Sequence, residues 1–130
     1  MNYNEKMLRS GAVLACIAVI AGAFGSHGLK KIINSESLEI YKTANTYQFF
    51  HSFAILFISL LSAGNSQKLL NWAYNLFIIG IFLFSGSLYL LSVREVLGIP
   101  SAIGAITPFG GLCFISAWIC LIIFSLKRNN

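Results

Sequence analysis

Four long stretches without a charged residue constrain the fold of this chain more than any other feature. They cover residues 10–29, 43–67, 69–93 and 96–126. A helix needs about 20 mainly apolar residues to cross the hydrocarbon core of a bilayer, and each stretch meets that length. Only 10% of the 130 residues are charged, whereas an ordinary soluble domain carries about a quarter. We therefore expect the chain to fold within a membrane.

The pattern inside these stretches predicts helices. A transmembrane barrel would need many segments of about 10 residues in which apolar and polar side chains alternate, and the four stretches do not alternate. The sequence thus predicts an all-α fold, in which residues 1–130 form a single membrane domain. This domain is an integral membrane four-transmembrane-helix bundle with approximate crossings at residues 8–26, 46–63, 71–92 and 107–126.

The segments between the crossings carry helix-capping signals. Asn34 or Ser35 is placed to cap a helix whose first turn holds Glu36, and this predicts an interfacial amphipathic lead-in to the second helix. The first helix is expected to end near Gly25 and Gly28, residues suited to a left-handed cap. Residues 63–70 are expected to form a short polar turn.

The last stretch is longer than one crossing requires. Thr107 followed by Pro108 is typical of a helix start, with the threonine as N-cap and the proline in the first turn. Residues 99–106 would then form an apolar loop at the interface. The alternative is a longer, kinked helix.

The net charge of +5 comes from nine Lys and Arg residues that flank the hydrophobic stretches. That placement indicates membrane topology, so we expect the lipid bilayer, and no nucleic acid, as the partner. With a cytoplasmic N-terminus, five of these residues lie inside and four outside. The positive-inside rule therefore favours two cytoplasmic termini by a narrow margin. Insertion in both orientations is the alternative.

Small residues recur along one face of the first and the fourth predicted helix. At such spacings they let neighbouring helices approach closely in lipid. The two stripes, which we expect to be helix-packing faces, consist of Gly11, Ala15, Ala18, Gly22 and Gly25 and of Gly110, Cys113, Ala117 and Cys120. Packing is thus the favoured role of two of the three cysteines, and the absence of a CxxC pair argues against a disulfide or metal framework.

Polar side chains of all four predicted crossings fall toward the same, outer side, because successive helices alternate in direction. Such groups face the bundle interior or a wet cavity in membrane proteins. The sequence therefore predicts a polar pocket as a ligand-binding hypothesis, with the members His27, Gln48, His51, Ser85, Tyr89 and Thr107. The alternative is that these side chains only join helices, at roughly 1 kcal/mol for each hydrogen bond.

The residues offer little for catalysis. No acidic or cysteine side chain accompanies the two histidines as a metal ligand, and no acidic residue is placed to orient a serine–histidine pair. We therefore expect no catalytic residue, no metal and no cofactor. The sequence predicts a non-enzymatic multi-pass membrane protein whose pocket binds a small ligand, a lipid headgroup or a partner helix.

Two other functions stay open at this point. One is a small channel or transporter that acts as a homo-oligomer, although all four glutamates lie outside the crossings and leave no intramembrane carboxylate for proton coupling. The other is a structural subunit or assembly factor of a membrane complex.

Four motifs occur in order along the chain: GAFGSHG at 22–28, YxxAxxYQxxH at 41–51, FSGSLY at 84–89, and TPFGG at 107–111 with Trp118. Together they resemble the YgdD-type family of small bacterial inner-membrane proteins of unknown function. The resemblance implies a bacterial inner-membrane location and an uncleaved first helix. The latter matters because Lys6, Arg9 and the AGA at 21–23 also resemble a cleavable signal peptide. The resemblance supplies no substrate, cofactor or activity.

Overall fold

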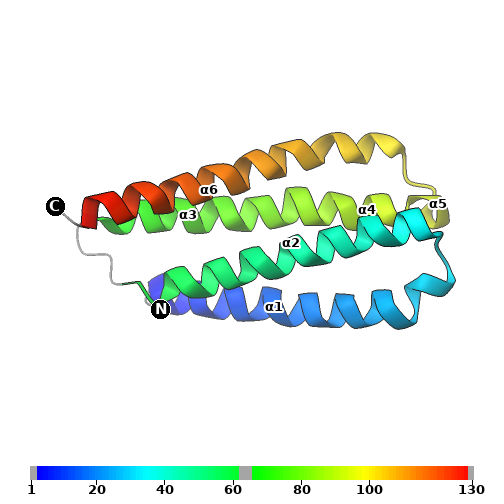
Figure 1. The fold of residues 1–130 in the computed structure, drawn as a ribbon, viewed down its shortest axis with the longest axis horizontal. Coiled ribbons are helices and arrows are strands. Elements are labelled where there is room, and N and C mark those ends of the chain that lie inside the picture. The colour runs from blue at the N-terminus through cyan, green and yellow to red at the C-terminus, as the bar shows by residue number, and fades with distance from the viewer. Residues whose placement is uncertain (1–2, 62–65, 129–130) are drawn as a thin grey trace.

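The computed structural model of the chain describes residues 3–61 and 66–128, and it is an elongated bundle of helices (Figure 1). None of the described residues lies in a strand, so the predicted all-α fold is confirmed. In chain order the elements are α1 (Tyr3–His27), the short 3₁₀ helix η1 (Leu29–Lys31), α2 (Ser35–Ser59), α3 (Gln67–Gly80), the π-helical η3 (Ile81–Gly86), α4 (Ser87–Ser92), α5 (Arg94–Leu97), the 3₁₀ helix η4 (Ser101–Ile106) and α6 (Thr107–Arg128).

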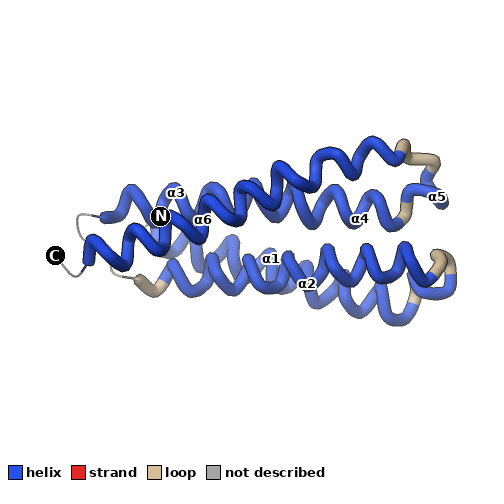
Figure 2. Tube along the Cα trace, turned by 45° about the horizontal axis from the view of Figure 1, so that its top comes forward, coloured by secondary structure: helices blue, strands red, loops and turns tan. Residues whose placement is uncertain are grey.

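The elements line up as antiparallel rods. α1 packs chiefly against α2 and α3 chiefly against α6, while α4 and η3 join the two pairs by packing on α2 (Figure 2). The start of α1 and the end of α6 lie at the same end of the bundle, and η1 and α5 lie at the other (Figure 1). We call the latter the η1 end.

Apolar side chains fill the interior and also cover much of the outside. The core includes Phe77, Met7 and Ile55, which are fully buried. Large apolar side chains such as Phe50 and Phe82, each 67% exposed, point outward. An apolar exterior of this extent marks a surface that faces lipid or another protein.

Three described helical segments are long and apolar enough to cross a membrane: Tyr3–Lys31, Gln67–Ser92 and Ser101–Lys127. α2, which holds the predicted crossing 46–63, is not among them. Buried Gln48, His51 and Ser52 reduce its mean hydropathy. The number of crossings therefore stays a prediction.

The predicted start of α2 is confirmed in one detail. The Asn34 side chain accepts a hydrogen bond from the Ser37 N–H at 2.8 Å and so caps the helix. From there α2 continues to Ser59, so the predicted lead-in and the second predicted crossing share one helix. The polar turn expected at 63–70 falls partly outside the described residues, and α3 already begins at Gln67.

Two helix ends lie where they were expected, since α1 ends at His27 and α6 begins at Thr107, but the expected caps are wrong. Gly28 has right-handed backbone angles, because its N–H bonds to the Phe24 carbonyl and the chain continues directly into η1. Gly98, at φ 68°, is the one left-handed glycine in the described part of the chain, and it ends α5. Thr107 already has helical angles, since η4 runs straight into α6; it is not an N-cap, and residues 101–106 are not a loop.

Candidate functional site

Three side chains of α2 donate hydrogen bonds to three backbone carbonyls of α1. The donors are spaced four and three residues apart, so they lie on one face of α2, and the acceptors mirror that spacing in the opposite direction. The bonds run from Tyr41 Oη to Ala21 O (2.7 Å), from Asn45 Nδ2 to Ala18 O (2.7 Å) and from Gln48 Nε2 to Leu14 O (2.9 Å). We call this set the carbonyl ladder.

Glycines of α1 let the ladder form. A Cβ atom at Gly25 would lie 2.5 Å from the Tyr41 ring, and one at Gly22 would lie 3.0 Å from Asn45 Oδ1. Further along, a Cβ at Gly11 would lie 2.9 Å from the Leu56 side chain. The small-residue stripe of α1 therefore faces α2, where it allows polar side chains to reach the backbone.

Tyr89 of α4 extends the ladder into the second helix pair. Its hydroxyl donates to Gln48 Oε1 at 2.8 Å and accepts from Asn45 Nδ2 at 3.1 Å. Its ring also meets the Tyr41 ring edge-to-face at 4.9 Å. Gln48 and Asn45 thus connect α1, α2 and α4. Asn45 was not singled out from the sequence, although its position between Tyr41 and Gln48 at helical spacing carries the signal.

His51 lies one turn further along α2, among aromatic rings. The imidazole is 6% exposed and stacks on Phe114 with ring centroids 3.5 Å apart and planes 6° apart. Trp118 Nε1 lies 3.3 Å from His51 Nε2, and His51 Nδ1 lies 2.7 Å from the Tyr47 carbonyl. Indole N–H can only donate, so Nε2 accepts and Nδ1 carries the proton. Both nitrogens of a neutral His51 are therefore engaged.

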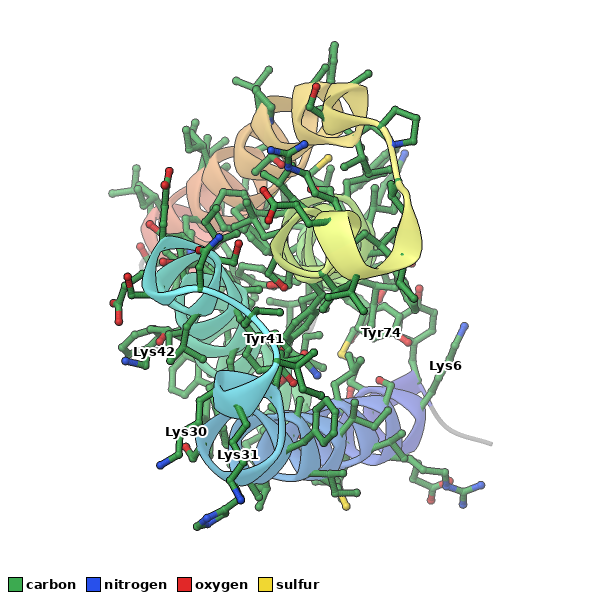
Figure 3. All side chains as sticks on the ribbon, turned by 90° about the vertical axis from the view of Figure 1, so that its right-hand side faces the viewer. Lys6, Lys30, Lys31, Tyr41, Lys42 and Tyr74 are labelled. Carbon is green, nitrogen blue, oxygen red and sulfur yellow. The ribbon has the colours of Figure 1, made fainter. Side chains whose placement is uncertain are left out.

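A cleft of about 560 Å³ opens between α1 and α2 at the η1 end. Its lining includes Tyr41 and Asn45 of the carbonyl ladder, together with Gly22 and Gly25. The complete lining is Gly22, Gly25, Ser26, Lys30, Leu38, Tyr41, Lys42, Asn45 and Thr46. Figure 3 looks onto this end of the bundle, with Lys30 and Lys42 on the same side of the α1–α2 pair and Tyr41 between the two helices. We call it the α1–α2 cleft.

Comparison with known proteins places the chain in a family. A family model described as "Protein of unknown function (DUF423)" matches residues 21–111, which include every lining residue of the cleft and all of η3 and α4. The chain belongs to the DUF423 family. The expectation of a membrane-protein family without a known function is thus confirmed, under the family names DUF423 and UPF0382, whereas the YgdD-type label stays a prediction.

Individual relatives carry the UPF0382 name. A "UPF0382 membrane protein" of Staphylococcus epidermidis is 44% identical over 117 residues, which cover 90% of this chain and 92% of the relative. "UPF0382 membrane protein YwdK" of Bacillus subtilis is 39% identical over 121 residues, with coverage of 90% and 93%. No solved structure matches the chain. The DUF423 chain is therefore a membrane protein, and its activity has to be argued from its own geometry.

The six predicted pocket residues lie in different surroundings. Gln48 and Tyr89 meet in the carbonyl ladder, whereas His51 lies among the aromatic rings. Thr107 Oγ1 lies 2.6 Å from Ser87 Oγ. Ser85 is 1% exposed, and its hydroxyl has no hydrogen-bond partner among the described residues. His27 is exposed at the end of α1. The α1–α2 cleft contains none of these six residues.

The second small-residue stripe faces α3 and η3. Ala117 is fully buried, Cys113 and Cys120 are half-buried, and a Cβ at Gly110 would lie 2.4 Å from the Phe84 backbone nitrogen. All three cysteines are free, and Cys16 is exposed. Within residues 3–61 and 66–128, no group of three or more His, Cys, Asp or Glu side chains is arranged to hold a metal ion.

The hydrogen bonds of His51 predict its tautomer. We expect the proton on Nδ1 and an unprotonated Nε2, because Trp118 can donate to Nε2 and cannot accept. Nitrogen-15 NMR of histidine-labelled protein in detergent distinguishes the two tautomers. In Trp118→Phe, which keeps an aromatic ring and removes the donor, the Nε2 resonance should shift. A wild-type Nε2–H tautomer would contradict this assignment.

Proposed function

We propose that this chain is a non-enzymatic, four-crossing membrane protein that holds a small polar molecule, of the size of a lipid headgroup, in the α1–α2 cleft. The observation that carries the proposal is the cleft itself. Its volume of about 560 Å³ lies within the range of about 300–1,000 Å³ that is usual for small-molecule sites. Its polar lining residues include Lys30 and Lys42, which lie near the turn of the chain at the η1 end.

The path of the chain supports α2 as a membrane crossing in addition to the three apolar helical segments. α1 ends at the η1 end and α3 begins at the opposite end, so α2 has to return across the same thickness (Figure 1). Its 25 residues give a length of about 37 Å, enough for a hydrocarbon core of about 30 Å. α2 also buries Gln48 and His51 while it exposes Phe53 and Phe57, which is the arrangement that lipid requires.

Four crossings predict a definite topology. An even number of crossings puts both termini on one side of the membrane, and the positive-inside rule predicts that this side is the cytoplasm. Lys30 and Lys31 of η1 should then face outward. We expect a cysteine that replaces Lys31, in a chain whose native cysteines are alanine, to react with a membrane-impermeant maleimide in intact cells. A C-terminal cysteine should react only after permeabilisation. Labelling of both positions in intact cells would indicate insertion in both orientations.

The buried polar groups support a non-enzymatic role. Buried Ser52, Ser59 and Ser92 each donate to a carbonyl of their own helical rod three or four residues earlier. Both nitrogens of His51 are engaged. An activated nucleophile needs a base within hydrogen-bond reach, and these groups do not provide such a pair.

Filling the cleft tests the proposal. Ser26→Trp places an indole among the lining residues, whereas Ser116→Trp adds the same group to the exposed face of α6. Native mass spectrometry of the protein extracted in mild detergent should show a retained small molecule or lipid on the wild type and on the Ser116→Trp control. We expect Ser26→Trp to reduce the retained fraction roughly tenfold or more. Equal retention by both variants, or none by the folded wild type, would refute the proposed function.

A further inference from the structure

The unengaged donors around the α1–α2 cleft indicate the chemistry of its ligand. We infer that the cleft takes an anionic phosphate group, carried by a lipid headgroup or by a small free phosphate compound. This inference rests on the proposed function, since it names the ligand class of the same cleft.

Three lining groups have hydrogen-bond donors to spare. Lys30 has no ion pair, and the hydroxyls of Ser26 and Thr46 have no hydrogen-bond partner, among the residues that the structure describes. By contrast, the lining residues Tyr41 and Asn45 already donate to α1 carbonyls. An ammonium group and two hydroxyls offer the donors that phosphate oxygens accept. The free donors therefore surround a space that suits an anion with several acceptor oxygens.

The charges around the cleft also favour an anion. The lining includes Lys30 and Lys42 and no acidic residue. The three glutamates of this end, Glu36, Glu39 and Glu95, are exposed and lie outside the lining. Lys42 Nζ does bond to Glu39 Oε1 at 2.7 Å, but both side chains are more than half exposed. Such an exposed pair opens at little cost, so Lys42 can turn toward a phosphate.

The expected position of the cleft relative to the bilayer also suits a phosphate ligand. Its lysines come from η1 and the early part of α2, where the chain turns outside the apolar stretches. Phosphates of a bilayer lie at this boundary between hydrocarbon and water. Basic pockets between membrane helices at that level bind lipid headgroups. Leu38 adds an apolar wall next to the lysines, which suits a group attached to an acyl chain or a carbon skeleton.

The lipids that the purified protein retains measure directly whether it prefers an anionic headgroup to a zwitterionic one. The full-length protein is reconstituted in phosphatidylcholine bilayers with and without phosphatidylglycerol, extracted in mild detergent and weighed by native mass spectrometry. We expect the wild type to retain phosphatidylglycerol in preference to phosphatidylcholine. Lys30→Ala should lower that preference about tenfold or more, because it removes a charge-assisted hydrogen bond to the bound headgroup. Glu39→Gln should raise it about 1.5- to 5-fold, because it frees Lys42.

Lys31→Ala is the matched control. It removes the same charge from the neighbouring position of η1, and Lys31 does not line the cleft. We expect Lys31→Ala to prefer phosphatidylglycerol over phosphatidylcholine as strongly as the wild type does. Equal losses in Lys30→Ala and Lys31→Ala would overturn the inference, since they would indicate general attraction of an anionic surface.

Two further outcomes separate the inference from the proposed function. If Ser26→Trp removes a bound lipid but phosphatidylcholine and phosphatidylglycerol are retained equally, the cleft binds lipid and the inferred preference for an anionic headgroup is wrong. If the folded wild type retains neither lipid and does not bind glycerol 3-phosphate, the proposed function fails as well. Displacement of phosphatidylglycerol by glycerol 3-phosphate would assign the site to a free phosphate compound, and retention against it would assign the site to the lipid.

Discussion

Replacing Gly110 by alanine is expected to destabilise the bundle by about 3 kcal/mol, the upper end of the usual cost of overpacking. A Cβ at this position would lie 2.4 Å from the backbone nitrogen of Phe84 and 2.8 Å from its Cα. Backbone atoms within a helix cannot rotate away as a flexible side chain can. η3 and α6 would therefore have to move apart.

Gly111→Ala provides the control for this prediction. Its Cβ would make ordinary contact with the Phe84 ring, at 3.8 Å. We expect a change within about 0.5 kcal/mol, as for substitutions that meet no close neighbour. Unfolding by increasing SDS in mixed micelles, followed by circular dichroism, measures both variants. Equal stabilities of Gly110→Ala and Gly111→Ala would mean that the close approach at Phe84 does not restrict packing.

The close approach at Gly110 coincides with the one π-helical segment in the described part of the chain. A π-helical turn contains an extra residue compared with α-helix, and such turns are found mostly where a helix has a functional or packing constraint. Phe84 and Ser85 both belong to η3, and the Ser85 hydroxyl is buried without a partner among the described residues. The α3–η3–α4 rod thus departs from regular α-helix where it lies close to Gly110 of α6.

Gln48→Leu is expected to have the second-largest effect, a loss of about 1–2 kcal/mol for two interhelical hydrogen bonds. The leucine keeps the approximate size of the side chain. It removes the donor to the Leu14 carbonyl and the acceptor for the Tyr89 hydroxyl. The half-buried Tyr89 hydroxyl would lose its acceptor, and a polar group without a partner is costly in lipid.

A double-mutant cycle with Tyr89→Phe isolates the Gln48–Tyr89 bond. We expect a coupling energy of about 0.6–1.7 kcal/mol, which spans the mean and the maximum found for such bonds in a membrane protein. Gln67→Leu is the control, since Gln67 Nε2 bonds only to Asn71 Oδ1 of the same helix among the described residues. SDS-induced unfolding measures all four variants. A Gln48→Leu protein as stable as Gln67→Leu would indicate that the carbonyl ladder does not hold α1 to α2.

The carbonyl ladder also shows why the candidate site could be predicted only in part. Gln48 and Tyr89 were expected to meet because both lie toward the same side of the bundle. Their contacts with α1 carbonyls were not expected, since a backbone acceptor leaves no signal in the sequence. Lys30 and Lys42 were read only as topological charges, because their convergence depends on how η1 turns into α2.

The sequence by itself determined the helices, the membrane environment and a helix cap at Asn34 or Ser35. These follow from hydrophobicity, charge and capping preferences, which act between residues close together in the chain. The tertiary structure alone decided the carbonyl ladder, the tautomer of His51, the π-helical η3 and the α1–α2 cleft. The interhelical bonds of the ladder join residues 20 to 44 positions apart. Contacts of that kind depend on which helix faces come together, and local patterns do not record that choice.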